Sequence, residues 1–359
     1  MRWPWQRQNS SDRLVCGWVD QTLSYVLARH QADGSYQVVT LGSQAQAADT
    51  LEAFASSLQS QGLKGLHASF MLRTDQYQLL QIDTPAVPPE ELRSAARYQI
   101  RDMLLTHVDD VTLDVVRVGD GKQQTNPHSF VVAATNAVVR ANMALADAMD
   151  WHVSVIDIQE MAQRNLQSAL ARAQEQAERA NAALVLLPGQ QALLTICAND
   201  ELFYTRRFDV PDGFLTGDWG HNVVVQAAQP DAYTPVEEYV PDYANTDLGY
   251  APYTPEAVKP SASSDSQAAD KAQRMVVEVQ RSLDVWDRTW SGLPLGQFRV
   301  YAGARSAELA QWLTEQLGQN VSTLDVGGLF TGLDATLLEA HPLCLPLLGV
   351  LLRTDGGKS

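Results

Sequence analysis

The sequence predicts a two-lobed α/β protein, and three observations indicate this. The chain has 359 residues, more than one ordinary domain needs, and 45% of them are apolar. Segments with strand-like composition alternate with segments of helical period along most of its length. Both halves also begin with hairpins of similar build, at residues 13–28 and 183–208. Such an internal similarity is expected of two related lobes.

The first half follows this scheme in order. Its opening hairpin turns at residues 20–22, and a third strand is predicted at 38–41. Residues 50–61 place apolar side chains on one helical face, and Gly62 then ends the helix. A further strand is predicted at 66–72.

Residues 81–118 are the most informative stretch of this half. Pro88 and Pro89 stand where a helix tolerates proline, because the N–H groups of its first turn have no intrahelical partner. The two glutamates that follow place negative charge at the positive end of the helix dipole. Apolar residues at helical spacing then predict a helix over 90–105. The elements expected around it are strands at 77–83, 111–118 and 129–134 and a helix at 137–149.

The order of motifs along the chain resembles the PilM family of type IV pilus assembly proteins. Within that family it resembles MshI-like proteins of the mannose-sensitive haemagglutinin (MSHA) pilus. The similarity is co-linear, although no single motif is diagnostic. The motifs are P-P-E-E-L (88–92), A-A-R-Y (95–98), D-D-V-T-L-D-V (109–115), V-V-A-A-T-N-A-V-V-R (131–140), F-Y-T-R-R-F (203–208), V-E-V-Q-R-S-L-D-V-W (277–286) and L-P-L-L-G-V-L-L-R (345–353).

The resemblance implies an actin-like (ribonuclease H-like) two-lobed fold. A small α+β subdomain is inserted in the first lobe, and the lid of the second lobe is reduced. We therefore expect the first lobe to comprise residues 13–180 and 335–353, with the subdomain at about 77–151. Residues 181–334 form the expected second lobe. A long helix at 159–179 suits a connection between the halves.

Residues 229–272 interrupt the alternating pattern. They are rich in proline, tyrosine and acidic residues, and serines crowd their end. Such a segment buries too little apolar area to offset the entropy of ordering, so a disordered acidic loop is predicted. Its repeated Y-x-P and P-x-Y spacing leaves open a partner-binding motif beside the plain-linker interpretation. Order resumes with a helix predicted from about residue 271.

The net charge of −16 argues against nucleic acid, because binding phosphates requires a basic surface. The cysteines Cys16, Cys197 and Cys344 are far apart in apolar contexts, which favours buried thiols in a reducing compartment. No signal peptide and no apolar run long enough to span a membrane is present, so a cytoplasmic protein is expected. The histidines are scattered without metal-ligand spacing, so no metal site is predicted.

An actin-type nucleotide site requires three glycine-bearing turns. In the family, the first two carry Asp-x-Gly. Here the first turn keeps Asp20 and Thr22 but not the glycine, the second keeps Gly189 but not the acid, and the third keeps Gly303 alone. Without these acids and glycines, Mg²⁺ and phosphate lose their ligands. We therefore expect a vestigial site, no ATP or Mg²⁺ cofactor and no enzymatic activity.

The favoured function is a cytoplasmic scaffold, peripheral to the inner membrane through its partners. By resemblance, it binds the cytoplasmic N-terminal tail of an inner-membrane PilN-like protein in a groove formed by residues 77–83, 90–105 and 131–136, and the pilus motor ATPase stays open as a second partner. An actin-like ATPase that switches or polymerises is one alternative. The other is a cytoplasmic component of a type II secretion platform, which would continue into a transmembrane helix. The candidate partner-binding residues are Leu92, Ala96, Tyr98 and Ile100.

Overall fold

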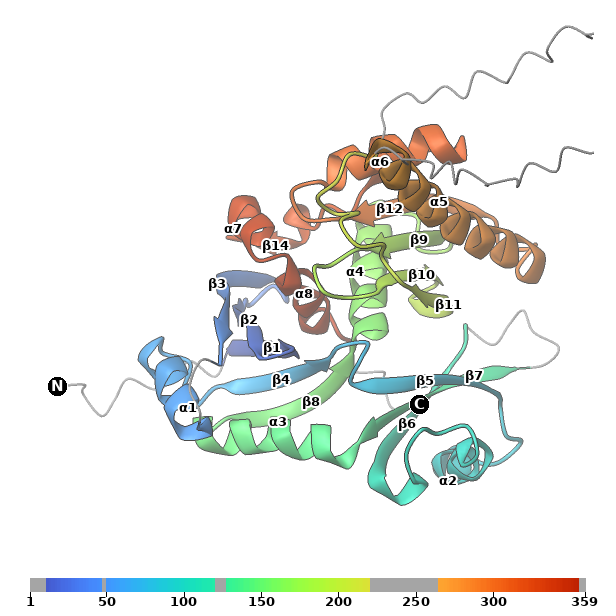
Figure 1. Ribbon diagram of the computed structural model, residues 1–359. Helices are drawn as coiled ribbons and strands as arrows, with labels where there is room; N and C mark the ends of the chain where they lie inside the picture. Colours follow the sequence, from blue (N-terminus) through green and yellow to red (C-terminus); the bar gives the residue numbers. More distant parts are fainter. Residues whose placement is uncertain (1–10, 47–49, 120–126, 220–263, 355–359) are drawn as a thin grey trace, which may run out of the picture.

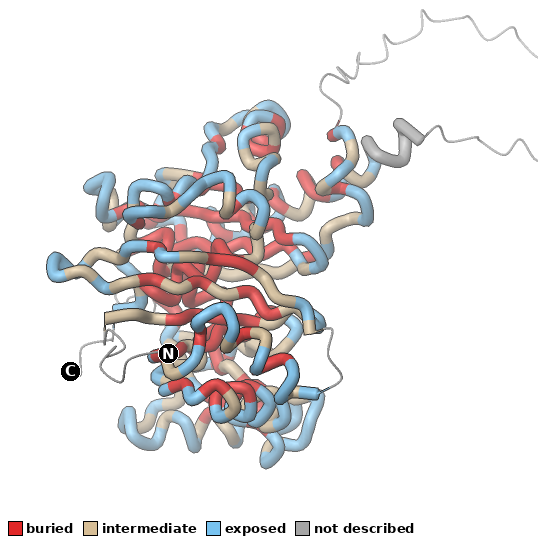
Figure 2. Tube along the Cα trace, turned by 90° about the vertical axis from the view of Figure 1, so that its left-hand side faces the viewer, coloured by how far each residue is buried: buried red, intermediate tan, exposed pale blue. Residues whose placement is uncertain are grey.

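The computed structural model describes residues 11–46, 50–119, 127–219 and 264–354. Three β-sheets organise these residues, two large and one small, with helices packed against them (Figure 1). Buried residues concentrate along the strands and the helix faces that cover them, whereas exposed residues lie on the outer turns (Figure 2).

The first sheet is mixed and carries the predicted opening hairpin. Along β1 (Asp12–Val19), Leu14 and Cys16 face one hydrophobic cluster while Val15 faces another, because successive side chains of a strand point to opposite faces of the sheet. The helices α1 (Leu51–Ser60) and α3 (Asn136–Met149) supply the first cluster. The strands, in spatial order, are β14 (Phe330–Thr331), β3 (Tyr36–Ala45), β2 (Thr22–His30), β1 (Asp12–Val19), β4 (His67–Leu72) and β8 (His152–Ile158).

The second sheet contains the second predicted hairpin. One face packs against α5 (Ser264–Thr289) and α6 (Ser306–Leu317). There Phe203 stands edge-on to Trp290, with ring centroids 4.9 Å apart, a geometry that aromatic pairs favour. The strands, in spatial order, are β11 (Glu201–Phe208), β10 (Ala192–Ala198), β9 (Ala180–Val185), β12 (Leu295–Tyr301) and β13 (Val321–Thr323).

Helix α4 (Gln159–Ala173) lies between the two large sheets (Figure 1). Its buried amides bind backbone carbonyls on both sides: Gln163 Nε2 donates to Ala183 O at 2.9 Å, and Asn165 Nδ2 donates to Gly349 O at 2.9 Å. Gly349 is required there, because a Cβ would lie 2.0 Å from Ala162 O. It belongs to the C-terminal helix pair, α7 (Ala335–Ala340) and α8 (Leu345–Leu351).

The third sheet projects from the first lobe and matches the predicted insertion in its strands. Helix α2 (Pro89–Ile100) covers one face, where Ala96 and Ile100 pack against Ile82 and Val131. It begins at the predicted proline. The strands, in spatial order, are β5 (Tyr77–Asp83), β7 (His128–Thr135) and β6 (Val111–Arg117).

Two predicted helices are shorter than expected. Helix α2 ends at Ile100 rather than at residue 105, and turns follow it. Helix α4 ends at Ala173 rather than at residue 179, and Glu175 then adopts a left-handed φ of 56°. The chain must turn at that point to enter β9 at Ala180, and this tertiary demand overrides the helix propensity of the following residues.

The predicted loop at 229–272 is wrong at its end, because α5 begins at Ser264. The helix-favouring alanine and glutamine residues there continue into a buried face that includes Ala272. Residues 229–263, and with them the expected reduced lid, lie outside the described residues.

The subdomain predicted at about 77–151 includes all of α3, but only part of this helix belongs to the small sheet. Helix α3 continues beyond the small sheet, and its Leu145 and Met149 join the core of the first lobe.

Candidate functional site

The base of the small sheet is fixed by a buried polar cluster. Glu160 on α4 is 0% exposed and accepts from Arg207 Nε of β11 at 2.8 Å. The Tyr77 hydroxyl of β5 donates to the other oxygen of the same carboxylate. Arg207 Nη1 also donates to Thr74 O at 2.7 Å. One carboxylate therefore joins the small sheet, the central helix and the second lobe.

The electrostatics of this cluster keep Tyr77 neutral. Burial, and then the charge of the Glu160 carboxylate, raise the pKa of Tyr77 well above its ordinary value of 10.0. The guanidinium of Arg207 lies 4.5 Å from the centre of the Tyr77 ring, which adds a cation–π contact. We conclude that this cluster is a structural anchor.

A second anchor lies at the end of β6. Gly119 N donates to Leu202 O of β11 at 2.8 Å, so the small sheet also binds the second lobe through its backbone. Gly119 has a φ of 69°, and a Cβ on it would lie 2.8 Å from the Phe203 ring. Glycine is required there for both reasons. The two anchors fix the small sheet relative to both lobes.

The surface of α2 and the segment after it is unusually apolar. Six large apolar side chains are exposed in the part of the chain that the structure describes, and three of them fall within residues 98–105. Tyr98 is 80% exposed, Met103 47% and Leu105 89%. Single exposed apolar residues are common, but a cluster of them marks an interaction surface. We call these three residues the α2 patch.

The backbone beneath the α2 patch is held in place. Leu105 N donates to Gln78 Oε1 of β5 at 3.0 Å, and Arg97 Nη1 donates to Val108 O at 2.6 Å. Strand β5 is an edge strand of its sheet. Leu105 therefore lies next to a sheet edge, and an extended peptide can pair with such an edge.

The predicted partner-binding residues divide between surface and core. Ala96 and Ile100 are 0% exposed, so they support α2 from inside and offer nothing to a partner. Leu92 is half-buried, and Tyr98 is the one predicted residue with a large exposed surface. The prediction missed Met103 and Leu105 because it continued the helix through them. Their apolar character next to polar Thr106 and His107 was the available signal.

The structure does not gather the predicted nucleotide residues in one cavity. Asp20 is exposed at the β1–β2 turn, and Thr22 begins β2. Gly189 lines a cavity of about 600 Å³ together with residues 209–216. Gly303 lines a different cavity of about 310 Å³. Asp20 and Thr22 line neither of these.

The charges around these two cavities do not suit a phosphate group. The Gly189 cavity is lined by Asp209 and Asp212, and the Gly303 cavity by Asp325 and Glu339. Neither lining contains a lysine or arginine among the described residues. A phosphate without a metal ion would therefore meet carboxylates in both linings, and Lys271 and Arg305 next to the Gly189 cavity donate to the carbonyls of Asp212 and Leu215.

The cysteines, the possible metal ligands and the helices of the described residues bear on the kind of site that they can form. All three cysteines are buried and unpaired with one another, and burial raises the pKa of Cys344 to about 11. Within residues 11–46, 50–119, 127–219 and 264–354, no group of three or more histidine, cysteine, aspartate or glutamate side chains is placed to hold a metal ion. Over the same ranges, no helix combines the length and the apolar character needed to cross a bilayer.

Comparison with known proteins places the fold. No protein-family model matches the sequence, and no curated protein matches it. The structure matches a chain of the PilM–PilN type IV pilus biogenesis complex with a TM-score of 0.62 at 16% identity, over 95% of this chain and 98% of the other. The chain thus has a two-lobed actin-like α/β fold, as the sequence predicted. Within that class, the particular fold that it shares is the one found in the PilM–PilN complex.

Two further likenesses are too weak to bear on function. The cytoplasmic domain of EpsL, an inner-membrane component of the type II secretion system of Vibrio cholerae, matches with a TM-score of 0.39 at 16% identity, over 60% of this chain and 79% of the other. A Bacteroides thetaiotaomicron protein with an actin-like ATPase fold and unknown function matches with a TM-score of 0.47 at 7% identity, over 96% and 97%. At such identities, likeness concerns the fold alone.

Proposed function

We propose that this chain is a PilM-like scaffold of a type IV pilus assembly platform. It binds the cytoplasmic N-terminal peptide of an inner-membrane PilN-like protein. The observation that carries the proposal is the α2 patch, Tyr98, Met103 and Leu105, which is connected to the edge strand β5 through the hydrogen bond from Leu105 N to Gln78 Oε1. The shared fold with a chain of the PilM–PilN complex supports it.

The physical basis of recognition is β-strand addition. An extended peptide pairs its backbone with the edge of β5 and places alternate side chains on the α2 patch. Backbone pairing contributes affinity with little sequence preference, and the apolar side chains select the peptide. The hydrogen bonds from Leu105 N to Gln78 Oε1 and from Arg97 Nη1 to Val108 O keep the edge and the segment after α2 in a fixed relative position, which lowers the entropy lost on binding.

The finer parts of the proposal rest on the sequence motifs. The resemblance to MshI-like proteins assigns the scaffold to an MSHA-type pilus. By the same resemblance, the chain lies in the cytoplasm and is held at the inner membrane through its partner. The pilus motor ATPase is a second candidate partner. No nucleotide is needed for this role, and the acidic cavities around Gly189 and Gly303 support a scaffold without ATPase activity.

The test measures binding of a fluorescent peptide that carries the cytoplasmic N-terminus of the host's PilN-like protein. Leu105→Asp and Tyr98→Ala should each lower the affinity about tenfold or more, because truncating a buried anchor typically costs more than 1 kcal/mol. Val39→Asp is the matched control, since Val39 is 47% exposed but lies on β3 of the first lobe. Circular dichroism verifies that each variant is folded.

Unchanged affinity in folded Leu105→Asp and Tyr98→Ala variants would contradict the proposal. Deletion of residues 81–118 is the less informative experiment. It removes β6 and α2 and exposes the buried Val131, so loss of binding would also follow from misfolding.

A further inference from the structure

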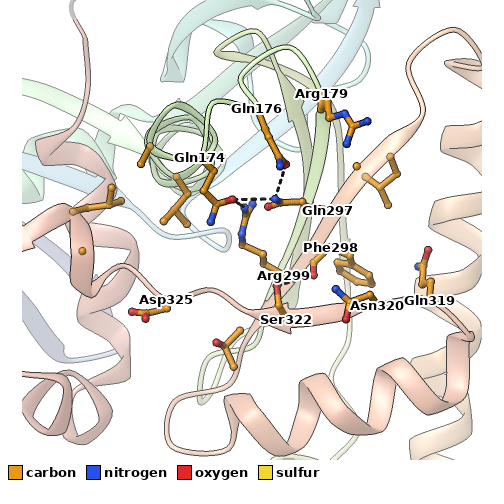
Figure 3. Close-up of a pocket in the computed structure, with 17 residues that line it drawn as sticks. Gln174, Gln176, Arg179, Gln297, Phe298, Arg299, Gln319, Asn320, Ser322 and Asp325 are labelled. Atoms are coloured by element: carbon orange, nitrogen blue, oxygen red, sulfur yellow. Dashed lines mark hydrogen bonds between the residues drawn. The ribbon is translucent and has the colours of Figure 1, made fainter.

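A cavity of about 700 Å³ lies at the edge of the second sheet, away from the α2 patch. It is bounded by the end of α4, by β12 and by β13 (Figure 3). Its volume falls within the range of small-molecule sites. The polar side chains that line it include Gln174, Gln176, Arg179, Gln297, Arg299 and Asp325.

Arg299 of β12 is the exceptional member of this lining. It is 4% exposed, and Nη1 has no hydrogen-bond partner in the structure. No ion pair joins Arg299 to a carboxylate within the described ranges of the chain. A buried charge without a counter-charge is costly, and burial accordingly lowers the pKa of Arg299. Arg299 is thus a buried guanidinium without a carboxylate partner among the described residues.

The neighbouring side chains show where an anion would bind. Gln174 Oε1 accepts from Arg299 Nη2 at 2.6 Å and from Gln297 Nε2 at 2.9 Å (Figure 3). Gln297 Nε2 is held in this direction by Gln176 Oε1 at 2.6 Å. One neutral oxygen therefore occupies the point on which two donors converge. Gln174 is itself exposed and follows the last residue of α4, so its side chain can move aside without disturbing the helix.

We propose that this cavity binds the carboxylate of a small organic acid on Arg299, with its oxygens replacing that of Gln174. A guanidinium and a carboxylate are both planar and form paired hydrogen bonds. Gln297 donates a further bond, and the exposed Arg179 supplies a second positive charge at the rim. The inference does not depend on the pilus assignment.

The charge balance selects a carboxylate rather than a phosphate. The lining contains one buried guanidinium, one exposed arginine and the carboxylate of Asp325. A phosphate monoester concentrates nearly two negative charges on one group at neutral pH, which a single buried guanidinium does not balance. A dicarboxylate such as succinate carries its two charges on separate groups, so that one carboxylate binds Arg299 and the other lies toward Arg179 at the rim.

The experiment is isothermal titration of the full chain with sodium succinate, neutral succinamide and sodium phosphate at one ionic strength. Succinate should give a saturable heat at concentrations up to about 10 mM, and succinamide none. Arg299→Gln should weaken succinate binding about tenfold or more, because it removes a charge-assisted bond. Arg288→Gln, an exposed arginine on α5, should retain the affinity of the unaltered chain.

Gln174→Ala provides a second variant that does not depend on the folding of Arg299→Gln. Because it removes the competing oxygen, it should bind succinate at least as tightly as the unaltered chain. No succinate heat, equal binding of succinamide, full binding by folded Arg299→Gln, or loss of binding in Gln174→Ala would each overturn the proposal. Tighter binding of phosphate than of succinate would overturn its carboxylate class.

Discussion

The α2 patch and the nucleotide-type turns differ in what they offer to a ligand. At and just after the end of α2, Tyr98 and Leu105 are largely exposed, and Leu105 is hydrogen-bonded to the edge strand β5. At the turns, Gly189 and Gly303 lie in separate cavities whose linings contain carboxylates. We propose the first region as a peptide site and the second as a vestigial nucleotide site.

The turns and the inserted sheet also differ in backbone and packing. Both turns contain a glycine in the left-handed region, with φ of 68° at Gly189 and 59° at Gly303. These two glycines line different cavities, and neither Asp20 nor Thr22 lines either of them. The inserted sheet, in contrast, is tied to both lobes by Glu160 and Gly119 and presents apolar residues outward. We make four predictions that test the contrast between these two regions.

The largest expected effect is at the anchor beneath the patch. Glu160→Gln leaves the partly buried Arg207 without its counter-charge, and loss of one partner of a buried pair costs about 3–5 kcal/mol. Urea denaturation measures the free energy of unfolding. The exposed Arg93–Asp114 pair is the control, and Arg93→Gln should cost about 0–1 kcal/mol. Equal effects of the two substitutions would show that Glu160 is not an anchor.

Substituting a buried residue of α2 should mainly lower stability, whereas substituting an exposed residue just after α2 should mainly lower peptide affinity. Ile100→Ala removes fully buried side-chain atoms and should cost about 2–5 kcal/mol in unfolding free energy. Leu105→Ala changes an exposed residue and should stay within about 0.5 kcal/mol. The peptide assay should give the opposite ranking for folded protein at low temperature. A stability loss at Leu105 as large as that at Ile100 would place Leu105 in the core.

The pH dependence of stability tests the buried thiol of Cys344, which donates to Gly42 O of β3. Burial raises the pKa of Cys344 from 9.0 to about 11. Below pH 9 the thiol is neutral in the folded and unfolded chains, so its contribution is fully present. As pH rises toward 11, the unfolded chain ionises first, and about 2 kcal/mol should be lost at ~1.4 kcal/mol per pKa unit. Cys344→Ala should flatten this part of the profile in urea titrations at pH 8–11, and an unchanged slope would contradict it.

The smallest expected effect is at the nucleotide-type turns. Isothermal titration with Mg-ATP should show no heat of binding, because Gly189 and Gly303 line separate cavities and neither lining contains a lysine or arginine within the described residues. The PilN-like peptide should bind with the same affinity with and without Mg-ATP. A micromolar dissociation constant for Mg-ATP would erase the contrast between the two regions and favour the ATPase alternative.

Local features predicted from the sequence agree well with the structure. The turn between β1 and β2, the start of α2 at Pro89 and the bounds of β5 and β6 all follow from period and turn chemistry within a few residues. The ends of α2 and α4 were predicted too late. A helix end depends on where the chain must go next, and that is not a local property.

The order of strands and helices could be predicted from local patterns, and the co-linear motifs predicted the two-lobed actin-like fold. The structure was needed to show that Ala96 and Ile100 are core residues while Tyr98 and Leu105 are surface residues. The same holds for the contact of Glu160 with Arg207 and for the burial of Arg299 without a counter-charge among the described residues. Burial and pairing depend on contacts between residues far apart in the chain, whereas period and turn chemistry act between neighbours.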